Sequence, residues 1–101
     1  MKRAAKIDAN QPDIVKHLRA IGCSVKSIAA VGDGVADLLV GRRLVNVLIE
    51  VKDPSQPPSR RRLTPDQVKF HKEWRGQIAV AETPQEAEAI VNAAEKWTLE
   101  K

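Results

Sequence analysis

The chain has 101 residues, of which 43% are hydrophobic and 30% charged, a size that favours one compact domain and nearly excludes a second. Its net charge is +4, and its single cysteine, Cys23, excludes intramolecular disulfides and thiolate metal clusters and suits a reducing compartment. No run approaches the roughly 20 apolar residues that span a bilayer, and no apolar signal core follows Met1, so we expect a soluble, cytoplasmic protein without a membrane partner.

The first predicted element is a helix that begins near Asn10 or Gln11 and runs to Gly22. Pro12 falls in its first turn, where a missing backbone N–H costs nothing. Apolar residues recur at helical spacing and predict the face that packs on the core. They are Ile14, Val15, Leu18 and Ile21.

Three strands are predicted next. Residues 23–30 mix small and β-branched side chains, and the sequence Gly-Asp-Gly at 32–34 ends that strand. Residues 37–40, which end at Gly41, and the β-rich run 44–52 predict an antiparallel hairpin. Asp53-Pro54 ends its second strand, because proline cannot donate into a ladder.

The second half of the chain predicts a helix, a strand and a last helix. Residues 55–62 contain Pro57-Pro58 and predict a mobile or extended basic loop. Thr64-Pro65-Asp66-Gln67 is a capping-box helix start, and that helix ends near Gly76. A strand at 77–82 and a helix from Thr83-Pro84 follow. The order α-β-β-β-α-β-α predicts a mixed four-stranded α/β sheet flanked by helices.

The positive charge is concentrated in the middle of the chain. The segment 52–75 holds seven of the 17 basic residues and three of the 13 acidic ones, whereas the residues after it are net acidic. A basic centre favours a polyanionic partner that meets one part of the surface. The alternative is an ordinary solvated face on a basic protein.

The chemistry-bearing residues lie at the end of the third predicted strand. Glu50 and Lys52 are two residues apart, so they share one face of that strand. If Gly41 faces a residue between 44 and 46, Asp37 lies across from a residue between 48 and 50. Two adjacent carboxylates beside a lysine suit a hard divalent cation such as Mg²⁺. The alternative is a solvated ion pair at a strand end, with Asp37 in a turn.

Several motifs, in order and with matching spacing over roughly residues 8–90, resemble the VRR-NUC (virus-type replication-repair nuclease) branch of the PD-(D/E)xK nucleases. These motifs are Gly34-Val35-Ala36-Asp37-Leu38-Leu39-Val40-Gly41, Ile49-Glu50-Val51-Lys52-Asp53, Leu63-Thr64-Pro65-Asp66-Gln67 and Trp74-Arg75-Gly76. The resemblance implies a single nuclease domain over 1–101, with a restriction-endonuclease-like αβββαβ core at about 8–92 and a C-terminal helix.

The resemblance also implies site residues. Asp37, Glu50, Lys52 and Gln67 would be catalytic, and Asp37, Glu50 and the Val51 carbonyl would hold Mg²⁺ or Mn²⁺. Gln67 has an alternative as a plain capping-box residue. Gln11 stands where many relatives carry a glutamate that reaches metal through water, which puts a second metal in doubt.

The function that the resemblance implies is metal-dependent hydrolysis of DNA phosphodiesters, either nicking or selective for branched DNA such as a Holliday junction. It further implies a homodimer and a bacterial cytoplasmic setting of phage or prophage type. The rival is a non-catalytic basic DNA-binding module. Candidate phosphate contacts come from the basic loop and the helix after it, although a plain surface charge is the alternative for each. They are Arg60, Arg61, Arg62, Lys69, Lys72 and Arg75.

Overall fold

A computed structural model of the chain describes residues 7–100. It contains a four-stranded sheet in the order β1-β2-β3-β4. The strands are β1 (Ser24–Ser27), β2 (Leu38–Arg42), β3 (Val45–Val51) and β4 (Ile78–Ala81). β1 and β3 flank β2 in antiparallel pairs, whereas β4 runs parallel to β3. The predicted mixed four-stranded sheet is therefore confirmed.

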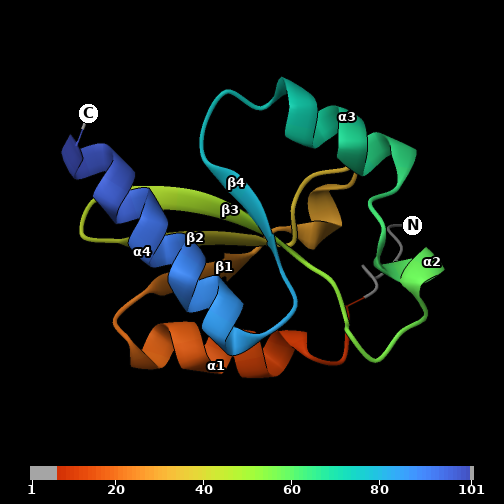
Figure 1. The fold of residues 1–101 in the computed structure, drawn as a ribbon, viewed down its shortest axis with the longest axis horizontal. Coiled ribbons are helices and arrows are strands. Elements are labelled where there is room, and N and C mark those ends of the chain that lie inside the picture. The colour runs from red at the N-terminus through yellow and green to blue at the C-terminus, as the bar shows by residue number, and fades with distance from the viewer. Residues whose placement is uncertain (1–6, 101) are drawn as a thin grey trace.

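Within residues 7–100, four helices and one short 3₁₀ turn accompany the sheet (Figure 1). The helices are α1 (Gln11–Ala20), α2 (Pro58–Arg61), α3 (Pro65–Glu73) and α4 (Pro84–Glu100), and the 3₁₀ turn η1 covers Ala29–Val31. α1 and α4 contact each other and pack against the strands, while α2 and α3 lie within the connection that carries the chain from β3 to β4. No helix among residues 7–100 is both long and apolar enough to cross a membrane.

The core lies between the sheet and the α1–α4 layer. Ile14 and Leu18 of α1 are fully buried, while Val15 and Ile21 pack on them from the edge, as the helical spacing predicts. Alternation along each strand supplies the opposite side of the core. Its buried members there are Val25, Leu38, Val40, Val47, Ile49, Val51 and Ala81. Glu50 and Lys52 therefore lie on the other face of the sheet, away from this core.

Two predictions about local structure are wrong. The strand predicted at 23–30 ends at Ser27, because Ile28, with a ψ of 12°, leaves the extended conformation and the chain then turns into η1. The segment 55–62 is not an extended loop throughout, since it contains α2. Pro58 takes the first helical position there, where its missing N–H has no partner to lose.

Candidate active site at the end of the β2–β3 hairpin

The hairpin places Asp37 and Glu50 side by side. Leu38 pairs with Ile49 across the ladder, so the preceding residue, Asp37, lies across from Glu50. The Oδ2 atom of Asp37 accepts a hydrogen bond from the Val51 backbone N–H at 2.7 Å. This bond holds the Asp37 carboxylate against the end of β3, within the range of positions that the sequence predicts.

Glu50 is a buried carboxylate. Its side chain is among the largest fully buried ones, and the residue is only 2% exposed. The pKa of Glu50 is raised to about 8, chiefly by burial and also by a hydrogen bond with Asp37 and charge repulsion from it, whereas the Lys52 charge acts to lower it. The Oε1 atom of Glu50 is buried and has no hydrogen-bond partner. A group in this position either keeps a proton at neutral pH or binds a cation.

Lys52 and Gln67 both contact Glu50, and these three side chains form the Glu50 cluster. The Lys52 ammonium lies 3.8 Å from Glu50 Oε2 and donates to Gln67 Oε1 at 2.8 Å. Gln67 Nε2 in turn donates to Glu50 Oε2 at 3.1 Å. The lysine is only 7% exposed, so its charge acts in a poorly solvated environment.

Gln67 is at once a capping residue and a member of this cluster. Its backbone N–H donates to Thr64 Oγ1 at 3.2 Å, and its Oε1 accepts from the Thr64 backbone N–H at 2.9 Å. The same Oε1 accepts from Lys52. Gln67 therefore makes the capping contacts and the contacts with Lys52 and Glu50 at once, because the capping box at the start of α3 fixes the side chain that reaches them.

Asn10 is a residue that sequence reasoning assigned only to a helix cap. It occupies the cap position of α1, but its side chain makes no capping hydrogen bond. Instead, Nδ2 donates to the backbone carbonyls of Lys52 and Glu82, both at 2.9 Å. The start of α1 is thereby tied to the ends of β3 and β4. The next residue, Gln11, is 4% exposed, and its Oε1 is buried without a hydrogen-bond partner.

His71 is a second neighbour of these residues, which the sequence alone favoured as a surface or satisfied histidine rather than a general base. It follows Gln67 by one helical turn of α3, which places both on one side of that helix. Burial lowers the pKa of His71, and so does the nearby charge of Lys52. Its Nε2 atom is buried without a hydrogen-bond partner. Only the four-residue spacing from Gln67 could have pointed to it.

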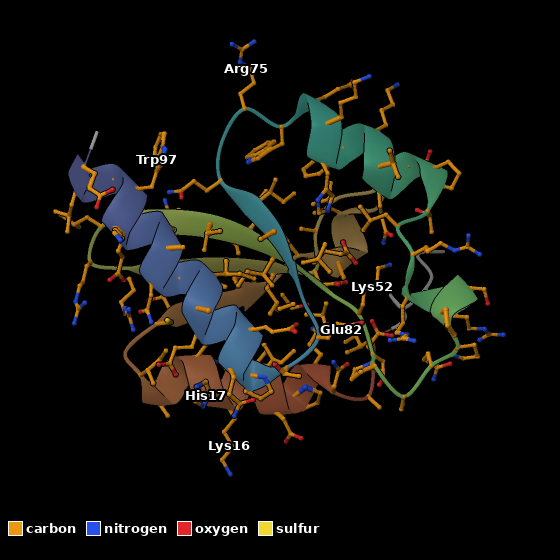
Figure 2. All side chains as sticks on the ribbon, in the orientation of Figure 1. Lys16, His17, Lys52, Arg75, Glu82 and Trp97 are labelled. Carbon is orange, nitrogen blue, oxygen red and sulfur yellow. The ribbon has the colours of Figure 1, made fainter. Side chains whose placement is uncertain are left out.

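The predicted phosphate contacts differ in their exposure and in their distance from the carboxylates. Arg60 and Arg62 are exposed on α2 and its end. Arg61 is half-buried, and its Nη1 lies 3.8 Å from a carboxylate oxygen of Glu82. Figure 2 shows Lys52 and Glu82 near each other, and Arg75 far from them on the connection between α3 and β4. Arg75 therefore lies well away from the carboxylates.

Lys69 and Lys72 are also exposed, on α3 between Gln67 and Arg75. The basic side chains of α3 thus form a series that leads away from the Glu50 cluster. A polyanion that follows α3 would reach the carboxylates only at the N-terminal end of this helix.

The arrangement suits one hard cation. Two carboxylates lie together, one of them buried with a free oxygen, and carboxylate oxygens are the ligands that Mg²⁺ and Mn²⁺ prefer. Within residues 7–100, no group of three or more His, Cys, Asp or Glu side chains is placed to hold a metal ion. Backbone carbonyls, water and substrate oxygens would have to supply the remaining ligands, as is usual for Mg²⁺.

The sequence matches no family model and no curated protein. Its structure does match a solved structure described as a VRR_NUC domain, with a TM-score of 0.60. The two chains are 23% identical, and the match covers 84% of this chain and 97% of the other. This likeness confirms the fold that the sequence motifs imply.

Proposed function

From a chain with the fold of a VRR-NUC domain, a nuclease-like fold, we propose a metal-dependent endonuclease that hydrolyses DNA phosphodiester bonds. The observation that carries this proposal is the buried carboxylate of Glu50. It lies across from Asp37, has an oxygen without a partner, and has a pKa raised to about 8. Such a carboxylate is costly in a metal-free fold and becomes favourable when a cation neutralises it.

In the proposed site, Asp37 and Glu50 bind Mg²⁺ or Mn²⁺ together with the Val51 carbonyl. When bound, such an ion polarises the phosphodiester and lowers the pKa of a coordinated water. The Val51 N–H orients the Asp37 carboxylate, as its 2.7 Å hydrogen bond indicates. Glu50 binds only after its proton leaves, so metal binding releases a proton at neutral pH.

Lys52 is the proposed electrostatic catalyst. Its ammonium already lies beside the buried carboxylate, where it neutralises negative charge that develops on the phosphate. Gln67 orients that ammonium through the 2.8 Å hydrogen bond, and its own bond to Glu50 Oε2 leaves Glu50 Oε1 open to the metal. Exposed Arg60, Arg62 and Lys69 would bind backbone phosphates and position the DNA without reading its sequence.

The test is cleavage of supercoiled plasmid and of a four-way junction in Mg²⁺ or Mn²⁺. We expect wild-type protein to cut and the variants Asp37→Ala and Lys52→Ala to lose cutting. Lys26→Ala, an exposed lysine on β1, is the matched control and retains it. DNA that is bound but left intact by the wild type would favour the rival function, a non-catalytic basic DNA-binding module.

We further propose a homodimer that acts on branched or duplex DNA. One protomer offers one cluster of this kind, and symmetric cutting of two strands needs two clusters related by a twofold axis. Light scattering at micromolar concentration should give about twice the 11.1 kDa mass. A monomeric mass together with single-strand nicks would contradict the dimer while leaving the nuclease proposal intact.

A further inference from the structure

Gly34 is the point where the segment before β2 meets the start of α3. The residue has a φ of +78°, which L side chains rarely adopt. A Cβ atom at this position would lie 2.9 Å from the Gln67 backbone nitrogen and would collide with the Asp66 carbonyl group. Both neighbours are backbone atoms, so no side chain can turn aside to make room. The two segments can approach this closely only because residue 34 is glycine.

Each side of this contact leads directly to the candidate site. Asp37 follows Gly34 by three residues, and its carboxylate accepts the Val51 N–H. On the other side, Gln67 receives the Lys52 ammonium and donates to Glu50. The Gly34 contact therefore sets the distance between the hairpin that carries the carboxylates and the helix that carries the bridging amide.

We propose that Gly34 is a positioning residue, whose lack of a side chain seats the first turn of α3 so that Gln67 holds Lys52 beside Glu50. This inference rests on the proposed nuclease function for its kinetic consequence. Any side chain at residue 34 displaces the Asp66–Gln67 backbone and draws the Gln67 amide away from its two partners. A misplacement of about 1 Å in a catalytic group can lower a rate by roughly a hundredfold.

Gly32 provides a matched control two residues earlier. Its φ is also +78°, and with a ψ of −161° it occupies a region that is essentially restricted to glycine. A Cβ at Gly32 would meet nothing within 4 Å. Gly32→Ala thus imposes backbone strain without crowding, whereas Gly34→Ala adds the collision with α3. A difference in cleavage between the two variants isolates the effect of the close approach.

The kinetic experiment measures single-turnover cleavage of plasmid DNA by folded wild type, Gly34→Ala, Gly32→Ala, Gln67→Ala and the double variant Gly34→Ala/Gln67→Ala. We expect Gly34→Ala to be at least about tenfold slower than wild type and Gly32→Ala to stay within about threefold. DNA affinity should be unchanged in both. The double variant should be no slower than Gln67→Ala, because both substitutions remove the same contact. Equal rates for the two glycine variants, or multiplicative losses in the double variant, would overturn the proposal.

A second measurement uses wild-type protein alone and needs neither cleavage nor a folded variant. In a ¹⁵N-labelled sample, an NOE is expected between a Gly34 Hα and the Gln67 backbone amide proton. The absence of this NOE would overturn the inference whatever the variants do. If the wild type shows the NOE but cuts no DNA, the proposed function fails while the close approach of Gly34 to Gln67 stands, and the two failures are thereby distinguished.

Discussion

Replacing Glu50 by glutamine should stabilise the metal-free protein at neutral pH while abolishing its metal response. Glutamine has nearly the shape of glutamate, and its Oε1 can still accept from Gln67 Nε2 as Glu50 Oε2 does. Its amide cannot ionise, so the substitution removes the cost of holding a carboxylate that is 2% exposed beside Asp37. The perturbation thus separates the charge of residue 50 from its packing.

The magnitude follows from the two pKa values. In the unfolded chain Glu50 titrates near 4.5, and in the folded protein near 8. Between these values the unfolded state has lost its proton and the folded state has kept it, so rising pH lowers the free energy of unfolding by about 1.4 kcal/mol per pH unit. At pH 7 the accumulated loss is about 3 kcal/mol, whereas below pH 4.5 it vanishes. Glu50→Gln should recover about this amount.

Urea unfolding at pH 4.5, 6, 7 and 8 without divalent metal measures the effect. A gain of about 3 kcal/mol at pH 7 corresponds to a Tm increase of more than about 10 °C in a domain of this size. Added Mg²⁺ should then stabilise the wild type and leave Glu50→Gln unaffected. Glu73→Gln, on the exposed side of α3, is the control and should show no pH-dependent gain. A stability difference that is the same at pH 4.5 and pH 8 would refute the buried-carboxylate reasoning.

Three further predictions concern other parts of the molecule. Lys52→Ala should lower the cleavage rate by about a hundredfold or more while far-UV circular dichroism stays unchanged, because its ammonium is the positive charge beside Glu50; residual cutting near the wild-type rate would contradict this role. Lys69→Gln should weaken DNA binding and reduce the slope of log K against log salt by about 1, measured by fluorescence anisotropy; an unchanged slope would remove Lys69 from the DNA interface. The hydrogen bond with Arg42 lowers the pKa of Glu95, so the wild type loses stability as pH falls through that pKa. Glu95→Gln cannot take up this proton and should lose less stability on acidification. Unfolding curves from pH 2 to 6 that match the wild type would contradict this prediction.

The hairpin register was predictable from the sequence only to within two residues. The apolar run 44–52 and Gly41 place a turn between them, but the turn has no Asn-Gly or Asp-Gly signature. In the structure Arg42 pairs with Val45, and the two residues between them, Arg43 and Leu44, both have positive φ, at 51° and 67°. Two bulky residues in this conformation are unusual. Local propensity therefore could not fix which residue of the second strand lies across from Asp37.

The short helix α2 shows a different limit of prediction. The pair Pro57-Pro58 favours an extended chain, because a residue before proline avoids the helical region. Pro57 is indeed extended, with a ψ of 152°, and Pro58 then begins a helix as its first residue. The first proline of the pair is extended and the second begins a helix. The dipeptide therefore predicts an extended residue at this point of the chain but not the helix that follows it.

The candidate site could be predicted in part, because some of its residues follow from strand geometry and others from the motif resemblance. Glu50 and Lys52 share a face by strand alternation, and the Asp37 position follows from pairing within the same hairpin. The motif resemblance added Gln67, whose contact with Lys52 depends on how α3 docks. Asn10 could not be found this way, since its partners lie 42 and 72 residues away and no local pattern encodes them.

The two hydrogen bonds of Asn10 have a consequence for biosynthesis. They join the beginning of the chain to the backbone at Lys52 and at Glu82, so three distant stretches must all be present before that junction closes. Such long-range closure comes late in folding, because the loops between the stretches must be ordered first. A growing polypeptide on the ribosome, with residue 82 still inside the exit tunnel, therefore lacks the junction between α1 and the ends of β3 and β4.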